Sequence, residues 1–365
     1  MGFIFEENSP NGSLLTQNGA VKIAAVILAA GASRRFGSPK QRVRIGGRTM
    51  LEMVADVARE AALRPVIAVV PPGLSVAPHI VPEINLRPEQ GLSHSLRLGL
   101  AAVPPETEGA VLLLGDQPRV TVRQIRALVD AVRGDRWVIA TRADGHLAPP
   151  VLLMRDAFVL ADDAVGDEGL RAILAGRPEL VTAVETFAHL VDVDTQQDLE
   201  GLTERCPGCG ALFEPMPDGP THEYIGASAA CWAAFGELLA REFQDATYGW
   251  IHRHTVDTYA VQHPGADGPR QRQSVAVHLI GLCHWLEHGM SASQLTPITQ
   301  ALTSEPREWP SLEPPDSYAM TVTDALGAID GESHGRLVHA WAESVWEAWG
   351  VHHDLVRRWA ADALR

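Results

Sequence analysis

The stretch VKIAAVILAAGASRRFGSPK, residues 21–40, joins an apolar run to a glycine-containing turn that ends in a lysine. Apolar runs rich in β-branched residues are typical of the buried strands of parallel sheets. In the turn, Gly31 and Gly37 would let backbone amides approach the oxygens of a polyphosphate, while Arg35 and Lys40 would supply positive charge for a triphosphate. Because the spacing is not that of a Walker A loop, a purely structural turn is the alternative.

Strand-like and helix-like segments alternate over the first 200 residues. The predicted strands are residues 21–30, 65–70, 109–115 and 137–141, and the predicted helices are residues 50–62, 91–103 and 121–133. In the last of these, apolar residues recur at helical spacing behind Thr121, which predicts a helix with a threonine N-cap. The alternation predicts an α/β fold, a Rossmann-like doubly wound and mostly parallel sheet, in which ligands bind beyond the carboxyl ends of the strands.

Residue usage changes sharply near position 200. All four cysteines, eleven of the fifteen histidines and eight of the nine tryptophans lie after it. The later part is predicted to be mainly helical, with helices at residues 228–243, 249–262, 271–288 and 334–364, as in a small bundle. We therefore expect a disordered extension over residues 1–20, a first domain over 21–200 and a mainly α-helical second domain over 203–365.

The composition excludes several classes of protein. The formal net charge of −15 disfavours a protein that coats nucleic acid, which needs clustered lysine and arginine. A membrane span is not expected, because the sequence lacks a long apolar run. The N-terminal residues do not have the pattern of a signal peptide, so a cytoplasmic location is expected. The cysteines are then expected as thiols or metal ligands rather than disulfides.

An aspartate stands directly after one of the predicted strands. Residues 110–114 are apolar, and Gly115-Asp116-Gln117-Pro118 follows them. At the carboxyl end of a buried strand, the carboxylate of Asp116 is well placed to hold Mg²⁺ against the oxygens of a triphosphate. The alternative is an aspartate that caps a helix or stabilises a turn.

The loop from Leu28-Ala29-Ala30-Gly31 to Lys40 and the segment around Asp116 resemble the signatures of the MobA-like nucleotidyltransferases. Further matching segments follow in the family's order up to about residue 200. The resemblance implies Mg²⁺-dependent transfer of a nucleoside monophosphate to a phosphorylated acceptor, with catalytic roles for Arg35, Lys40 and Asp116. It also implies that the nucleotide contacts Leu28, Ala29, Ala30, Gly31, Ser33, Lys40, Asn85, Gly91, Ser93 and Ser95.

Two further aspartates, Asp192 and Asp194, alternate within residues 191–195. At the end of a strand, alternate residues share one face. The segment is similar to the closing D-x-D-T segment of the family, which implies a second contact to Mg²⁺. Which of the two aspartates faces the metal is left open, and capping of the next helix by Asp194 or Thr195 is the alternative.

The resemblance also bears on the substrates. Guanylyl-transferring relatives usually carry a second glycine at the place of Ala30, so the resemblance favours the molybdenum-cofactor cytidylyltransferases, with CTP and molybdopterin as substrates and a molybdoenzyme or its chaperone as a partner. Residues 166–171, which include Glu168, are similar to a segment near the acceptor. A sugar or polyol phosphate is the alternative acceptor. His94 and Pro149 depart from the family pattern, which leaves open a non-catalytic nucleotide-binding or nucleotide-sensing module.

The second part opens with a metal-type motif. Cys206 and Cys209 have the C-x-x-C spacing of a zinc knuckle, and the glycines around Cys209 would permit the tight turn. A structural zinc site would need His222, Cys231 or a histidine of the helical region, and free thiols or redox chemistry are the alternatives. His284 and His288, one helical turn apart, mark a second candidate metal site. The stretches 206–213, 219–232 and 257–264 resemble a bacterial domain family of unknown function.

Overall fold

The computed structural model describes residues 21–31, 33, 35–133, 137–143, 145–167, 169–185, 191–304 and 307–365, so the expected extension over residues 1–20 and Glu168 lie outside it. The chain folds into two compact units. The first holds the residues up to Gln41 together with Met50–Asp194, and the second holds Arg42–Thr49 together with Thr195–Arg365.

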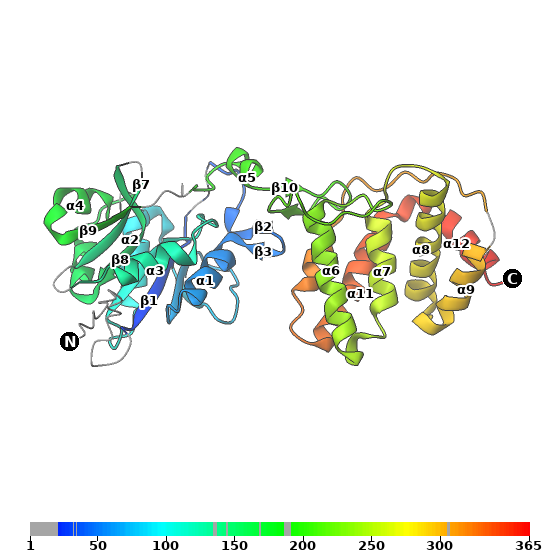
Figure 1. The fold of residues 1–365 in the computed structure, drawn as a ribbon, viewed down its shortest axis with the longest axis horizontal. Helices are drawn as coiled ribbons and strands as arrows, with labels where there is room; N and C mark the ends of the chain where they lie inside the picture. Colours follow the sequence, from blue (N-terminus) through cyan, green and yellow to red (C-terminus); the bar gives the residue numbers. More distant parts are fainter. Residues whose placement is uncertain are drawn as a thin grey trace, which may run out of the picture. The chain divides into compact units, whose positions relative to one another are not determined.

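The first unit is built on a mixed, mostly parallel sheet (Figure 1). Its described strands are β1 (Ile23–Leu28), β4 (Val66–Val70), β5 (Val81–Ile84), β6 (Gly109–Leu114), β7 (Val138–Ala143), β8 (His146–Met154) and β9 (Val181–Glu185). They lie in the order β5-β4-β1-β6-β8-β7-β9, and β8 runs antiparallel to both of its neighbours. The predicted doubly wound, mostly parallel α/β fold is confirmed.

Strand β1 lies in the interior of the sheet, between β4 and β6, and is buried on both faces. Because side chains alternate along a strand, Ile27 packs into one apolar cluster and Val26 into the other. The first cluster includes residues of α1 (Met50–Glu60) and α3 (Val122–Asp130), and the second includes residues of α2 (Leu92–Ala101) and α4 (Arg171–Gly176). The helices therefore cover both faces of the sheet.

The edge of the sheet that carries the site is set by β1 and β6. These strands are parallel neighbours, but the chain leaves them in opposite directions, toward β4 and toward β8. Ligands of open α/β sheets bind at such a reversal. A β-carbon at Gly115 would lie 2.8 Å from the β-carbon of Ala29, so this glycine lets the segments after the two strands approach each other.

Local signals in the sequence explain several helix boundaries. Helix α3 begins behind Thr121, whose hydroxyl accepts from the backbone of Gln124, while the Gln124 side chain accepts from the backbone of Thr121. This reciprocal capping confirms the predicted threonine N-cap.

Residues 42–49 leave the first unit as a hairpin of β2 (Arg44–Ile45) and β3 (Arg48–Thr49) that packs within the second unit. The backbone N–H of Gly46 donates to the carbonyl of Leu212, 2.8 Å away. Gly47 has a positive φ of 83°, and a β-carbon there would lie 2.9 Å from the carbonyl oxygen of Thr323. A glycine is therefore required at the tip of the hairpin.

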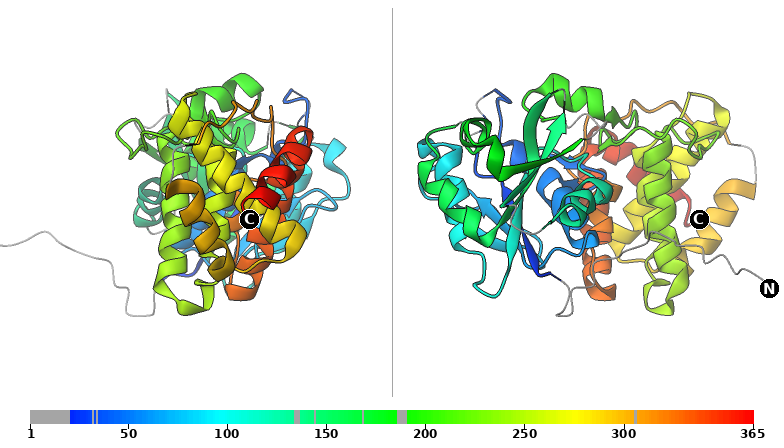
Figure 2. Two further views of the ribbon diagram at one scale, coloured as in Figure 1. Left: turned by 90° about the vertical axis from the view of Figure 1, so that its right-hand side faces the viewer. Right: turned by 60° about the vertical axis from the view of Figure 1, so that its left-hand side comes forward.

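The second unit is mainly helical (Figures 1 and 2). Its apolar core includes Tyr259, Trp341 and Trp349. Its described helices are α5 (Gln196–Leu202), α6 (Ala229–Gln244), α7 (His252–Gln262), α8 (Pro269–His288), α9 (Ala292–Ser304), α10 (Val322–Leu326), α11 (Gly331–Ala348) and α12 (His353–Asp362). A short ribbon of β10 (Glu204–Arg205) and β11 (Leu212–Phe213) precedes α6.

The expected single helix over residues 334–364 is wrong. The chain forms α11 and α12, separated by a 3-10 turn that includes Gly350. Trp349 before the break and Val356 after it both pack into the core, and glycine inside a helix is unfavourable. The break lets both helices turn their apolar faces toward the same core.

None of the helices in the described part of the chain is both long enough and apolar enough to cross a membrane.

One histidine is buried in the helical core, and the free-energy cost of its burial depends on pH. His254 of α7 is only 2% exposed, its ring stacks on Trp285 with the ring centres 3.7 Å apart, and its Nδ1 has no hydrogen-bond partner among the described residues. Burial lowers the pKa of His254 from its ordinary value of 6.5 to about 4, although Asp257 opposes the shift. His254 is therefore neutral in the folded chain at neutral pH.

Helix packing in the first unit is tested by alanine at Gly99 of α2. A β-carbon there would overlap the side chains of Val26 and Val69, so we expect Gly99→Ala to lower the free energy of unfolding by about 1–3 kcal/mol. Gly236 of α6 is the matched control, since a β-carbon there meets nothing within 4 Å. Gly236→Ala should stabilise its unit by roughly 0.5–1 kcal/mol. Calorimetry, with tryptophan fluorescence to assign the helical unit, measures both; equal signs would contradict this packing.

Acid should weaken the helical unit through His254. Because the folded-state pKa is depressed, the unfolded chain binds the proton first, so stability is lost as the pH falls from about 6.5 to about 4. We expect His254→Phe, which can keep the stack on Trp285, to remove roughly 3 kcal/mol of this pH dependence. Urea unfolding followed by tryptophan fluorescence at several pH values measures it. Parallel curves for the two proteins would show that His254 does not titrate as described.

Candidate functional site

A cavity of about 560 Å³ opens at the carboxyl ends of β1 and β6. Most of the sequence-predicted site residues line it, namely Leu28, Ala29, Ala30, Gly31, Ser33, Arg35, Lys40, Gly91, Ser95, Asp116, Asp192 and Asp194. Asn85 and Ser93 are not among the lining residues and are buried, Asn85 completely. His94 and Pro149, which depart from the family pattern, also do not line the cavity.

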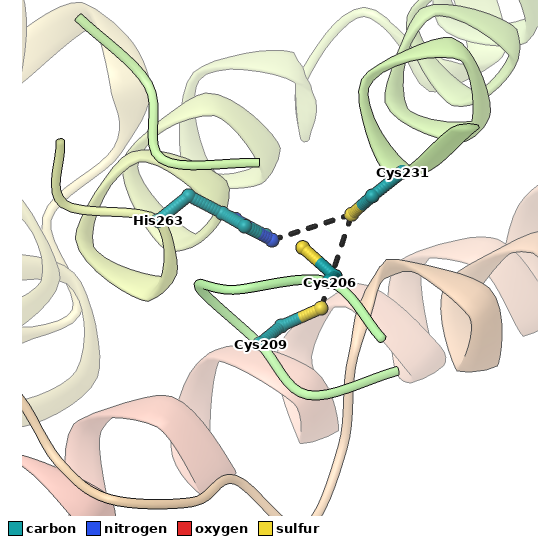
Figure 3. A group of neighbouring side chains, drawn as sticks. All are labelled: Cys206, Cys209, Cys231 and His263. Carbon is teal, nitrogen blue, oxygen red and sulfur yellow. Dashed lines mark hydrogen bonds between the residues drawn. The ribbon is translucent and has the colours of Figure 1, made fainter. Parts of the chain in front are cut away.

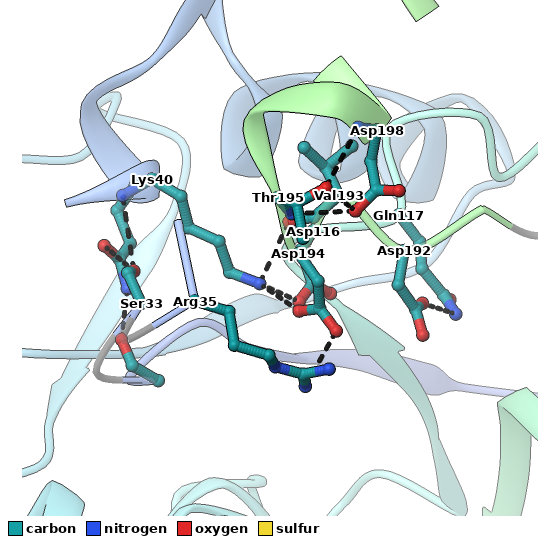
Figure 4. A network of polar contacts seen from close by, with 12 residues as sticks. Ser33, Arg35, Lys40, Asp116, Gln117, Asp192, Val193, Asp194, Thr195 and Asp198 are labelled. Atoms are coloured by element: carbon teal, nitrogen blue, oxygen red, sulfur yellow. Dashed lines mark hydrogen bonds and ion pairs between the residues drawn. The ribbon is translucent and has the colours of Figure 1, made fainter. Parts of the chain in front are cut away.

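Lys40 is the centre of the polar contacts in this cavity (Figure 4). Its Nζ donates to Asp116 Oδ2 at 2.6 Å, to Asp194 Oδ1 at 2.9 Å and to the carbonyl of Val193 at 3.1 Å. Burial by itself lowers the pKa of Lys40, but the hydrogen bonds and negative charges of Asp116 and Asp194 outweigh it, so the pKa lies above its ordinary value. Lys40 is therefore a fixed positive charge among carboxylates.

The closing aspartates are held by separate partners. Asp194 also pairs with Arg35, whose Nη2 lies 2.9 Å from Asp194 Oδ2. Asp192 accepts from Gln117 Nε2 at 2.8 Å. Burial raises the pKa of Asp192, an effect that Gln117 partly offsets and that the charges of Asp116 and Asp194 increase. Both Asp192 and Asp194 thus face the cavity.

The segment that carries these aspartates differs from the expected strand end. Residues 191–194 form a loop after α4 and β9, fixed by a hydrogen bond from the Val193 amide to the carbonyl of Asp116. The next helix, α5, is capped by Thr195 and Asp198, which exchange side-chain and backbone hydrogen bonds. Thr195 therefore takes the capping role, and Asp194 bonds to Lys40.

The loop after β1 is braced by a residue that sequence reasoning missed. Gln41 Nε2 donates to the carbonyl of Gly31 at 2.5 Å, and its Oε1 accepts from the hydroxyl of Ser33 at 3.1 Å. The same hydroxyl accepts from the backbone amide of Lys40 at 3.3 Å. The position of Gln41 next to Lys40 was the available signal, because a polar side chain there can fold back onto the loop.

The opposite wall is built around Gly91. This residue has a φ of 81°, and a β-carbon on it would lie 2.6 Å from Asp167 Oδ1, which accepts from the backbone amide of Leu92. Asn85 Nδ2 donates to the hydroxyl of Ser95 at 2.9 Å. Asn85 therefore holds Ser95 at the cavity wall rather than facing the cavity itself. Asp167, which belongs to the segment 166–171 expected near the acceptor, also lines the cavity.

The charge of the cavity is unbalanced. Among its described lining residues, Glu89, Asp116, Asp167, Asp192 and Asp194 are acidic, whereas Arg35 and Lys40 are the basic ones. A polyanion would be repelled by this set without added positive charge. Carboxylate oxygens are the ligands that Mg²⁺ prefers, so Asp116, Asp192 and Asp194 could hold such an ion.

A second cluster of metal-binding groups lies in the helical unit (Figure 3). Cys206, Cys209, Cys231 and His263 are all buried, and their ligand atoms lie within 4.8 Å of one another. The two residues that join the predicted Cys206 and Cys209 come from the first turn of α6 and from the residue that ends α7. His222 does not belong to the cluster; its Nδ1 accepts from the amide of Tyr224.

The thiols of this cluster affect each other's ionisation. The pKa of Cys206 is lowered, first because Cys209 and then because Cys231 hydrogen-bonds to its sulfur. The pKa of Cys209 is raised to about 12 and that of Cys231 is raised further, mainly because each donates to Cys206. The three thiols therefore do not ionise independently of one another.

Other histidines of the helical unit contact buried carboxylates, and His334 Nε2 lies 2.9 Å from Glu242. His252 Nδ1 lies 2.9 Å from Glu242, and His278 Nδ1 lies 2.6 Å from Asp257. The predicted pair His284 and His288 is not the group that the structure assembles, which consists of Cys283, Glu287 and His288. Glu287 of this group is already paired with Arg357.

Comparison with known proteins identifies both parts of the chain. Residues 25–183 match the model of the MobA-like NTP transferase domain, and residues 204–350 match a family of unknown function (DUF5946), which confirms both resemblances. Purine catabolism protein PucB of Bacillus subtilis is 27% identical over 196 residues, or 49% of this chain and 94% of that protein.

Two further relatives carry nucleotidyltransferase names. The 2-C-methyl-D-erythritol 4-phosphate cytidylyltransferase of Streptomyces coelicolor is 33% identical, over 50% of this chain and 66% of that protein. A probable molybdenum cofactor guanylyltransferase of Natranaerobius thermophilus is 26% identical, over 35% of this chain and 63% of that protein. Residues 25–183 thus form a domain of the MobA-like NTP transferase family, and residues 204–350 form a domain of the family of unknown function.

Proposed function

We propose that the first unit transfers CMP from CTP to a phosphorylated acceptor, with molybdopterin as the favoured acceptor and pyrophosphate as the second product. The observation that carries the proposal is the convergence of Lys40, Asp116 and Asp194 on one cavity at the carboxyl ends of β1 and β6. These three residues lie in segments far apart in the sequence, and the fold brings their charged groups into direct contact.

The reaction requires little proton transfer from the protein. A phosphate monoester is largely ionised near neutral pH, so an oxygen of the acceptor phosphate can attack the α-phosphorus of the nucleotide directly. A new P–O bond forms there, the bond to the β-phosphate oxygen breaks, and pyrophosphate leaves with the electron pair. Catalysis then consists of positioning and of stabilising negative charge on the phosphoryl oxygens.

Each part of the cavity has a role in that step. Lys40 and Arg35 would exchange their carboxylate partners for phosphate oxygens, and the braced loop at Gly31 would offer backbone amides to them. Asp116, with Asp192 or Asp194, would hold Mg²⁺, which supplies the positive charge that this acidic cavity lacks. Ser95, fixed by Asn85, lies on the wall proposed for the base or ribose.

One cavity residue and the names of two relatives support the proposed nucleotide and acceptor. Ala30 lines the cavity where guanylyl-transferring relatives carry glycine, which supports CTP, and one relative's name is that of a cytidylyltransferase. Another relative is named as a probable molybdenum cofactor guanylyltransferase, which supports molybdopterin as the acceptor but makes GTP the competing nucleotide. With molybdopterin as the acceptor, a molybdoenzyme or its chaperone is the proposed partner. The cytidylyltransferase is named for a polyol phosphate, so a polyol or sugar phosphate is the second candidate acceptor.

The test is pyrophosphate release by the full chain with Mg²⁺ and each nucleoside triphosphate in turn. We expect release with CTP in the presence of molybdopterin, and at least about tenfold less with GTP, which corresponds to the binding energy of one or two lost hydrogen bonds. Release with a polyol phosphate but not with molybdopterin would move the assignment to the second acceptor. Tight nucleotide binding without release with any acceptor would instead indicate a nucleotide-sensing module.

The contribution of the charged centre is tested by Lys40→Ala and Asp116→Asn. Each should lower kcat/KM for pyrophosphate release by about 10²-fold or more, because each removes charge that the transition state requires. The matched control is Lys22→Ala, which replaces the chain's other lysine, an exposed residue before β1. It should stay within about twofold of the wild type. Full turnover by Asp116→Asn would refute the catalytic assignment.

A further inference from the structure

We propose that Cys206, Cys209, Cys231 and His263 bind one structural Zn²⁺ ion, which fastens the β10–β11 ribbon to the ends of α6 and α7. The proposal concerns the helical unit and does not depend on the reaction proposed for the first unit. It starts from four buried ligand groups that meet at one point from three separate segments of the chain (Figure 3).

Two distances between ligand atoms of this group are close to those of a tetrahedral site. With Zn–S bonds of about 2.3 Å and a Zn–N bond of about 2.0 Å, tetrahedral angles place two sulfurs about 3.8 Å apart and a sulfur and a nitrogen about 3.5 Å apart. In the structure, the sulfurs of Cys209 and Cys231 are 3.8 Å apart, and Cys231 Sγ lies 3.3 Å from His263 Nε2. An ion of this size therefore requires little movement of the ligands.

The imidazole of His263 is oriented as a ligand by its surroundings. Its Nδ1 donates to the carbonyl of Tyr259 at 2.8 Å, which places the proton on Nδ1 and leaves the lone pair of Nε2 toward the sulfurs. The hydroxyl of Tyr259 in turn donates to Cys231 Sγ at 3.5 Å. Metal-binding histidines usually have such outer contacts, which fix the tautomer and the orientation of the ring.

The backbone of the knuckle is shaped for the same centre. The amide of Gly210 donates to the carbonyl of Cys206 at 2.9 Å, and Gly210 has a φ of 77°. A β-carbon at Gly208 would lie 2.6 Å from the ring of His263, so glycine lets the turn between the two cysteines close over the imidazole. The C-x-x-C turn and His263 are therefore fitted to each other.

The donor set favours zinc in a structural role. Three thiolates and one imidazole are soft or borderline ligands in a tetrahedral arrangement, which suits Zn²⁺ and not Mg²⁺ or Ca²⁺. All four ligands are buried and fill the four positions, so water or substrate has no open position, unlike in catalytic zinc sites. A disulfide is the competing chemistry, but all four cysteines of the chain are free thiols in the structure.

The site joins the β10–β11 ribbon to the ends of two helices of the core. Cys206 directly follows β10, and β11 comes three residues after Cys209, so the ribbon of only two residues per strand is closed at its turn by the ion. Cys231 lies in the first turn of α6, and His263 directly follows the last residue of α7. A two-stranded ribbon of this length is not stable alone, so the ion would supply its attachment.

The experiment begins with metal analysis of the full chain, purified under reducing conditions without chelator. We expect about one zinc per chain, as in other sites with four protein ligands. Cys231→Ser and His263→Gln should each lower the zinc content at least about tenfold, the typical loss on removing one ligand or its support. Cys283→Ala is the matched control, since Cys283 is a buried cysteine outside the cluster, and it should keep the zinc.

A measurement on the unaltered chain covers the case in which the variants fail to fold. Replacement of zinc by Co²⁺ should give the intense visible bands of tetrahedral cobalt together with thiolate-to-cobalt charge-transfer absorption. Mercurial titration should release the zinc with about three thiols per ion. A folded wild-type chain that contains no zinc and gives no cobalt bands would overturn the proposal, as would a disulfide between two of the three cysteines in that sample.

Discussion

The ion pairs of Lys40 with Asp116 and Asp194 are the constraint on which the architecture of the first unit depends. A lysine and two carboxylates at a partly buried sheet edge are tolerated because each satisfies the others, whereas any one alone would lose hydration without compensation. The arrangement requires β1 and β6 to be neighbours and the loop of residues 191–194 to return to their ends. The order of the strands and the position of the closing loop are thus tied to one cluster of charges.

The same arrangement prepares the cavity for a charged ligand. Positive groups already in contact with carboxylates can exchange those partners for phosphate oxygens, and the released carboxylates are then available to a divalent cation. The second cluster, which consists of Cys206, Cys209, Cys231 and His263, differs from this cavity in its ligand atoms and its burial. Its ligand atoms are sulfur and nitrogen, and all four residues are buried. Its proposed role is to join segments of the chain and not to bind a substrate.

Hydrophobic periodicity and local motifs predicted the structural features that depend only on residues close together in the sequence. The buried run that became β1, the threonine cap of α3 and the aspartate after β6 were all readable, because each is fixed within a few positions. The antiparallel course of β8 was not predicted, since an apolar run does not reveal the direction of its partner. The break at Gly350 was missed because the helical spacing of apolar residues continues across it.

The site residues divide in the same way, into those that local sequence reveals and those that depend on the folded chain. Lys40 and Asp116 could be named from their segments, but Gln41 as a brace and Asn85 as a support for Ser95 depend on contacts that only the folded chain creates. Cys206 and Cys209 can be recognised in the sequence by their C-x-x-C spacing. Cys231 was one of several candidates, and His263 was one of many histidines until the end of α7 was placed beside the knuckle.

The hairpin of residues 42–49 has a consequence for the way this chain can be divided. It is encoded immediately after Lys40, yet its backbone bonds to Leu212 and its tip glycine fits against Thr323. A piece cut at residue 200 would carry that hairpin without the surface to which it is matched. The first part of the chain therefore cannot simply be joined to a different second domain. In such a recombinant protein, the hairpin of residues 42–49 would have to change as well.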